Sequence, residues 1–150
     1  MGEDLIYEGI GSVTATFKVS DTTQTYLKTN HLNAATGNVD INGKQLAVKL
    51  GTDGTVGFGA STPTVADALF GIILAYEMDG HATVRFRGGS DYVPTKEAIT
   101  TGLKQLAVNN KGELVVLADA VATSTLTKGG KEAEVVKESK AGNLFASIIL

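Results

Sequence analysis

One stretch of the chain, residues 70–88, constrains the fold more than any other. It reads FGIILAYEMDGHATVRFRG, in which an apolar run from Phe70 to Glu77 is followed by Asp79-Gly80. Asp-Gly supplies the positive φ angles that a tight hairpin turn requires. Residues Ala82 to Gly88 then alternate between apolar and polar side chains, as in a strand with one buried face. The stretch predicts a β-hairpin in which a central strand, apolar on both faces, lies beside a more exposed partner.

The composition favours one turn-rich β domain. The chain has 150 residues, 18 of them glycine, and 43% of its residues are hydrophobic. This is enough apolar sequence to close one core without disulfides or metals. We therefore expect an all-β protein, or a mainly β protein with one or two short helices. Its hairpins are expected to build a small β-barrel or β-sandwich over residues 1–150, with an extended N-terminal arm at residues 1–11.

Further elements are predicted on both sides of the hairpin. Alternating apolar residues predict a half-buried strand at Ser12–Ser20. A long loop is expected at Thr29–Gly43, and one helical turn at Val65–Leu69, capped by Thr62 or Thr64. Lys128–Gly142 is rich in charge and predicts either a short helix ending at Gly142 or a solvated loop. The other predicted strands are Gln24–Lys28, Lys44–Leu50, Thr55–Gly59, Tyr92–Pro94, Lys104–Val108, Glu113–Leu117 and Leu144–Leu150, the last of them inside the sheet.

The pentapeptide KQLAV occurs twice, at Lys44–Val48 and Lys104–Val108. A glycine precedes each copy and a glycine-containing turn follows each. The repeat is explained either by duplication of a hairpin unit or by convergence of two strands on one apolar pattern.

The charged and sulfur-containing residues exclude several classes of function. The net charge is −3 and no basic stripe is present, so we expect no nucleic-acid surface. The absence of cysteine removes disulfides, thiolate catalysis and cysteine-based zinc sites, and fits a cytosolic origin. Residues 1–9 lack the features of a signal peptide. The apolar stretch Leu69–Tyr76 is too short to span a membrane, so no membrane partner is expected.

No motif in the sequence assembles a reactive centre. His31 and His81 stand outside any metal-ligand spacing, and no GxSxG elbow is present. Asp53 and Asp79 each lie in a turn that lacks the further carboxylates of a calcium loop. We therefore expect a protein that is not an enzyme and that has no catalytic, metal or cofactor site. One alternative remains, because Gly57–Thr62 resembles the glycine-rich phosphate-binding tail of trimeric dUTPases, a family of β enzymes of nucleotide metabolism.

The candidate functional residues are therefore contact residues. The apolar triplet Leu5-Ile6-Tyr7 is either part of a frayed edge strand or an arm that pairs with a neighbouring subunit's sheet edge. The long loop and the hairpin tip are the other exposed segments, and such segments commonly carry contacts. The candidate subunit or capsid contacts are Leu5, Ile6, Tyr7, His31, Leu32, Asn33, Asp79, Gly80 and His81.

A series of short features in the last half to two-thirds of the chain resembles one protein family. They are Phe70-Gly71-Ile72, Asp79-Gly80, Ala82–Gly88, Val93-Pro94, Ile99–Gly102, Leu106–Leu114 and Ala141–Leu150. In this order they resemble the strands and turns of tailed-phage capsid decoration proteins, also called cement proteins.

The resemblance implies a structural virion protein without enzymatic activity. Such a protein is made in the host cytoplasm, binds the outer surface of the capsid and stabilises it by bridging subunits of the major capsid protein. It also implies a homo-oligomer, with a trimer favoured over a dimer. Another structural phage component, such as a β module of a tail or fibre, is the alternative within the virion.

Overall fold

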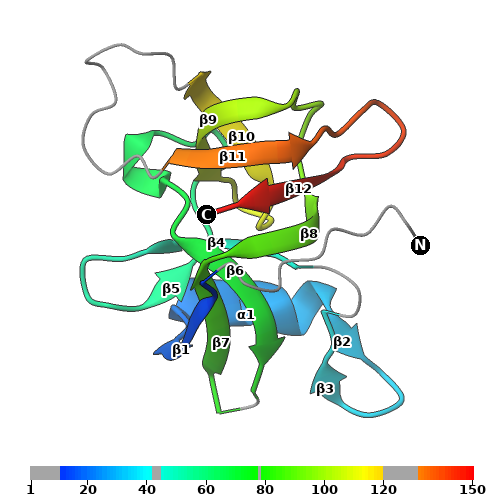
Figure 1. Ribbon diagram of the computed structural model, residues 1–150. Helices are drawn as coiled ribbons and strands as arrows, with labels where there is room; N and C mark the ends of the chain where they lie inside the picture. Colours follow the sequence, from blue (N-terminus) through cyan, green and yellow to red (C-terminus); the bar gives the residue numbers. More distant parts are fainter. Residues whose placement is uncertain (1–10, 42–44, 78, 120–131) are drawn as a thin grey trace.

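The computed structural model describes residues 11–41, 45–77, 79–119 and 132–150, which form two curled β-sheets stacked on each other (Figure 1). Half of the described residues lie in strands and these ranges contain one α-helix, so the prediction of a mainly β, barrel-like fold is confirmed. Residues 1–10, which carry the predicted arm and the candidates Leu5, Ile6 and Tyr7, lie outside the described residues.

The first sheet has five antiparallel strands in the order β1-β7-β6-β4-β5. The predicted central hairpin is confirmed, because β6 and β7 pair and β6 has a strand on each side. Beyond the end of β1, Val19 forms a parallel bridge with Val56 of β5, which curls the sheet toward a barrel. The strands are β1 (Val13–Lys18), β4 (Ala47–Leu50), β5 (Val56–Gly57), β6 (Gly71–Tyr76) and β7 (His81–Arg87).

The second sheet also has five antiparallel strands, in the order β8-β12-β11-β9-β10. The predicted C-terminal strand is confirmed in an interior position between β11 and β8. Just after β8, Thr95 forms a parallel bridge with Leu114 of β10. The strands are β8 (Gly89–Pro94), β9 (Gly102–Val108), β10 (Leu114–Asp119), β11 (Glu132–Lys137) and β12 (Phe145–Ile149).

The two sheets repeat one topology. If the five strands of each sheet are numbered by their order in the sequence, both sheets have the spatial order first, last, fourth, second, third. The first strand (β1 or β8) pairs with the last (β7 or β12), and the last pairs with the fourth (β6 or β11). The fourth pairs with the second, and the second with the third. The parallel bridges Val19–Val56 and Thr95–Leu114 join the first and third strands at equivalent places. The last two strands also share a register shift, after Ile73 in the first sheet and after Val135 in the second.

The two KQLAV copies lie at different positions along equivalent strands, because Ala47-Val48 of the first copy begins β4 whereas the second copy ends β9. The pairs Leu50–Val56 and Val108–Leu114 close the two corresponding hairpins. The second copy therefore reaches its turn, whereas the first ends two residues before it. A displacement of two residues keeps every side chain on its own face. The topology of the two sheets is repeated, but the two pentapeptide copies are offset from each other by two residues.

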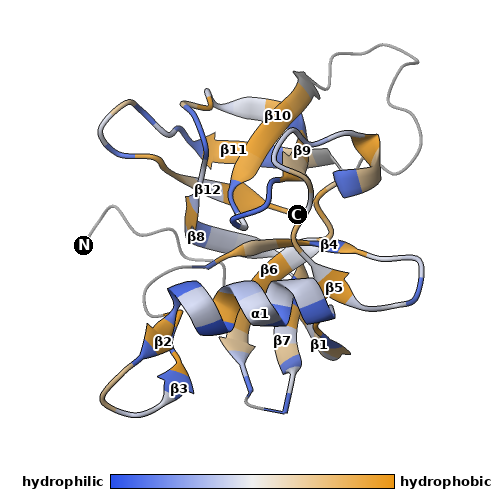
Figure 2. Cartoon of the chain, turned by 180° about the vertical axis from the view of Figure 1, so that it is seen from behind, coloured by the Kyte–Doolittle hydropathy of each residue, from blue (hydrophilic) through white to orange (hydrophobic). Residues whose placement is uncertain are grey.

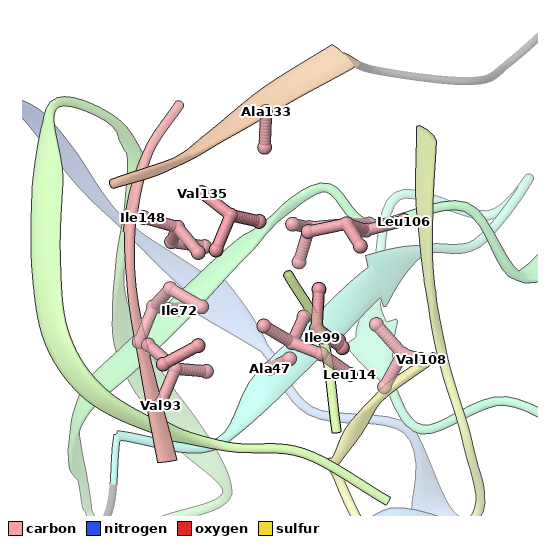
Figure 3. Packing of buried hydrophobic residues seen from close by; sticks show 12 residues of the cluster. Ala47, Ile72, Val93, Ile99, Leu106, Val108, Leu114, Ala133, Val135 and Ile148 are labelled. Atoms are coloured by element: carbon pink, nitrogen blue, oxygen red, sulfur yellow. The ribbon is translucent and has the colours of Figure 1, made fainter. Parts of the chain in front are cut away.

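Two hydrophobic cores explain why some strands are apolar on both faces. Val48 and Ile73 point into the core enclosed by the first sheet. Their neighbours Ala47 and Ile72 point the other way, into the core of the second sheet, where Ile72 lies among Val93, Val135 and Ile148 (Figure 3). Burial of an isoleucine side chain stabilises a protein by roughly 1.5–3 kcal/mol. The continuous apolar run of β6 thus serves both cores.

The strand predicted at Gln24–Lys28 is wrong, because Asp21–Asn30 forms the helix α1, which lies against the first sheet (Figure 2). Residues 24–28 include a β-branched and an aromatic residue, Thr25 and Tyr26, whose preference for strands is weak and easily overridden. The hydroxyl groups of Thr25 and Thr29 donate to carbonyl oxygens one turn earlier, and Leu27 is buried. Docking of Leu27 therefore selects the helix.

Two further expectations are settled by the structure. The helical turn is confirmed as η1 (Val65–Asp67), in which the Thr64 side chain accepts a hydrogen bond from the Ala66 N–H. The helix or loop expected at Lys128–Gly142 is wrong over residues 132–137, which form β11, while residues 128–131 lie outside the described part. Ala133 and Val135 alternate with the exposed Glu134, so the period of two outweighs the density of charge.

Replacement of Gly80 by valine is expected to destabilise the protein by about 2–3 kcal/mol, because a β-branched residue at positive φ is strained. Gly80 has φ +88°, and an added Cβ would lie 2.8 Å from the Gln24 amide nitrogen. Gly54 has a similar φ of +82° in open space, so Gly54→Val is the matched control. Urea denaturation should show the larger loss for Gly80→Val, and equal losses would contradict the packing of the turn on α1.

Candidate contact site

Five of the described candidate residues, Leu32, Asn33, Asp79, Gly80 and His81, lie on two hairpins, and the sixth, His31, lies beside Leu32 in the sequence. Among the residues that the structure describes, no three His, Asp or Glu side chains come close enough to hold a metal ion. His31 follows the end of α1, whereas His81 begins β7. No helix in the described ranges is long and apolar enough to cross a membrane. With the exception of the buried Gly80, the candidates among the described residues are therefore surface residues available for contacts.

The tip of the β6–β7 hairpin is held firmly from both sides. The Asp79 carboxylate accepts a hydrogen bond from the His81 N–H (3.1 Å) and lies 3.3 Å from the His81 ring nitrogen Nδ1. The Gly80 carbonyl accepts a hydrogen bond from the Val19 N–H (2.8 Å). Asp79 is exposed while Gly80 is buried. The tip thus presents Asp79 and part of His81 on a rigid backbone.

The second hairpin lies inside the predicted long loop. Strands β2 (Leu32–Asn33) and β3 (Asn38–Val39) pair to form it. Asn33 shapes its turn, because its carbonyl oxygen accepts from Gly37 N–H and its side chain accepts from Ala35 N–H. Leu32 is 51% exposed, so its apolar side chain is available for contact. It is the most apolar contact candidate among the described residues.

The structure brings these two hairpins to one end of the molecule. Both views show the β2–β3 hairpin and the β6–β7 tip at the same end, away from the second sheet (Figures 1 and 2). His31 does not join them, because its ring contacts the Tyr26 ring with centroids 5.9 Å apart. The described candidates thus divide into a hairpin end, at which Leu32, Asn33, Asp79 and His81 lie with Gly80 buried in the tip, and a separate His31.

His31 lines a pocket of about 290 Å³ where α1 meets the second sheet. Tyr26 lies in its wall, and burial followed by the nearby charge of Glu113 raises the pKa of the Tyr26 phenol. Lys111 and Glu113 come from the β9–β10 turn, far away in the sequence. Sequence reasoning missed this pocket, since no local pattern brings residue 26 to residue 113.

Tyr92 is another surface residue that sequence reasoning missed. It is 47% exposed and has φ +57°, the one positive φ outside glycine among the described residues. It lies in β8 where the pairing with β12 shifts register, and the Lys137 ammonium lies 5.9 Å from its ring centroid. A strained aromatic residue on the surface is a feature of contact and binding sites.

The fold and the hairpin end define a class: a mainly β protein with two barrel-like halves and projecting, rigid hairpins. Comparison with protein-family models, curated proteins and solved structures finds no match.

Proposed function

We propose that the protein is a structural component of a phage particle that binds the outer capsid surface and stabilises the shell by bridging major capsid protein subunits. The observation that carries the proposal is the hairpin end, where the exposed Leu32 and Asp79 are presented on hydrogen-bonded turns. The series of features from Phe70 to Leu150 that resembles decoration proteins gives independent support.

The physical demands on a cement protein fit this molecule. A protein that bridges two capsid subunits has to keep its shape when the subunits that it joins move relative to each other. The body behind the hairpin end has two packed cores joined through Ala47 and Ile72. Contacts on a shell can be individually weak, because each is repeated many times and multivalent attachment adds their effects. Such a protein is expected to act as an oligomer, with a trimer favoured.

The test is binding to purified shells from which the protein has been removed. We expect the wild-type protein to rebind and to raise the temperature at which the shells break. Leu32→Asp should weaken binding by about tenfold or more, because it places a charge at an apolar contact. Val65→Asp is the matched control, since Val65 is 53% exposed but lies on η1, outside both hairpins.

Two results would argue for the alternatives. Failure to bind shells, together with binding to purified tails or fibres, would show that the protein is a tail or fibre component. A rise in melting temperature with a nucleotide would support a nucleotide-metabolism enzyme instead, because a ligand that binds only the folded state stabilises it.

A further inference from the structure

The first sheet has an open edge along β1. This strand is the end member of its sheet and pairs with β7 on one side. Across the described residues, its other side is joined to a strand only beyond Lys18, through the Val19–Val56 bridge. Val13 is 42% exposed, and Thr14, Thr16 and Lys18 are also exposed. An open edge of this length is a template for another strand.

The open edge is positively charged at both ends. Lys18 ends β1, and the exposed Arg87 of β7 lies opposite Val13 at the other end. The intervening Arg85 already has a hydrogen-bond acceptor within the chain, because its guanidinium donates to the Gly89 carbonyl (2.6 Å). Neither β1 nor β7 contains an acidic residue, although the chain as a whole carries a net charge of −3. The edge thus selects an extended segment with carboxylates at its ends.

The chain's own sequence contains a segment of that kind. Residues 3–8 read EDLIYE, three apolar residues between acidic ones. Five positions separate Glu3 from Glu8, and five separate Val13 from Lys18. At about 3.3 Å per residue both stretches span roughly 17 Å when extended. The charges of the segment and of the edge are therefore complementary in sign and in spacing.

We propose that residues 3–8 of a second copy of this chain add as a strand to the open edge of β1. Main-chain hydrogen bonds supply the attachment, and the acidic ends fix the register against Lys18 and Arg87. On the inward face of the edge, Ala15 and Phe17 are half-buried, and an added strand would cover them further. The proposal does not rest on capsid binding, since it concerns contacts between copies.

Two charge-reversed variants test the proposal. The arm variant is Glu3→Lys/Glu8→Lys, and the edge variant is Lys18→Glu/Arg87→Glu. The wild-type protein should form oligomers in light scattering. Each variant alone should self-associate at least about tenfold more weakly, because two attractive pairs become repulsive. An equimolar mixture should recover assembly, since each arm then meets an edge of opposite charge.

The control is Lys96→Glu/Lys140→Glu, which makes the same change in net charge as the edge variant, at exposed lysines outside β1 and β7. This control should assemble like the wild type, and circular dichroism should show that all variants fold. A monomeric wild-type protein would overturn the proposal. Unchanged assembly of both variants, or a mixture that stays monomeric, would overturn it as well. Loss of shell binding by the edge variant with its oligomer intact would assign the edge to the capsid protein instead.

Discussion

Replacement of Gly59 by alanine is expected to lower the free energy of unfolding by at least about 3 kcal/mol, at the upper end of the range for overpacked sites. An added Cβ would overlap the Val108 carbonyl oxygen and lie 2.7 Å from the Cβ of the buried Asp67. Gly59 also donates its N–H to the Asn109 carbonyl, which ties the first sheet to the β9–β10 hairpin. Because the overlap is with a backbone oxygen, rotation of a side chain cannot relieve it and the backbone has to move.

Gly11→Ala is the matched control for this substitution. No atom lies within 4 Å of the place where its Cβ would be, so its effect should stay within about 0.5 kcal/mol. Denaturant unfolding of both variants measures the difference. Equal denaturation midpoints for the two variants would show that the packing around Gly59 can accommodate a methyl group, which would contradict the prediction.

Replacement of Asp67 by alanine should destabilise the protein by about 3 kcal/mol at neutral pH, since removal of a buried partner leaves the remaining groups unpaired. Its carboxylate accepts from the Lys49 ammonium (2.8 Å) and from the Thr64 N–H (3.1 Å), and its side chain is 7% exposed. The substitution thus removes an ion pair together with the Asp67 half of the capping box of η1.

This loss should depend on pH in a defined direction. Burial raises the pKa of the Asp67 carboxyl, but the hydrogen bonds from Lys49 and Thr64 and the Lys49 charge outweigh it, so the pKa lies below its ordinary value of 3.8. A group with a lowered pKa stabilises the folded state fully above its unfolded pKa. The difference between wild type and Asp67→Ala should therefore be constant near neutrality and shrink as the pH falls below about 4.

Urea titrations at several pH values measure this difference, provided that both proteins remain folded at the lowest pH. Lys49→Met separates the ion pair from the cap, because it leaves the Thr64 hydrogen bond in place. It should cause a smaller loss than Asp67→Ala. A difference between wild type and Asp67→Ala that grows on acidification would contradict the assigned direction of the pKa.

The parts of the fold that could be predicted are those with strong local patterns. Asp79-Gly80 between an apolar run and an alternating strand was sufficient for the β6–β7 hairpin. Thr62 and Thr64 marked the start of η1, and Thr64 is the residue that caps it. The helix α1 was missed because its stability comes from Leu27 docking on distant strands. Strand β11 was missed because its charged residues concealed the alternation of Ala133 and Val135.

The candidate site was predicted only in part for a related reason. Turn residues such as Asn33 and Asp79 mark exposed hairpins in any sequence, and both lie on the hairpin end. His31 was a candidate because it falls in the predicted loop Thr29–Gly43, yet it follows the end of α1 and its ring contacts Tyr26. The strained Tyr92 arises from the pairing of β8 with β12, which no local pattern encodes.

The shared hydrophobic cluster has a mechanical consequence. Ala47 and Ile72 belong to the first sheet but are set into the interior of the second, so the halves cannot swivel independently. A contact that fixes the hairpin end therefore also fixes the direction in which the far sheet points. On a repeating lattice, every attached copy would hold that sheet at one height and one angle, as a rigid spacer does.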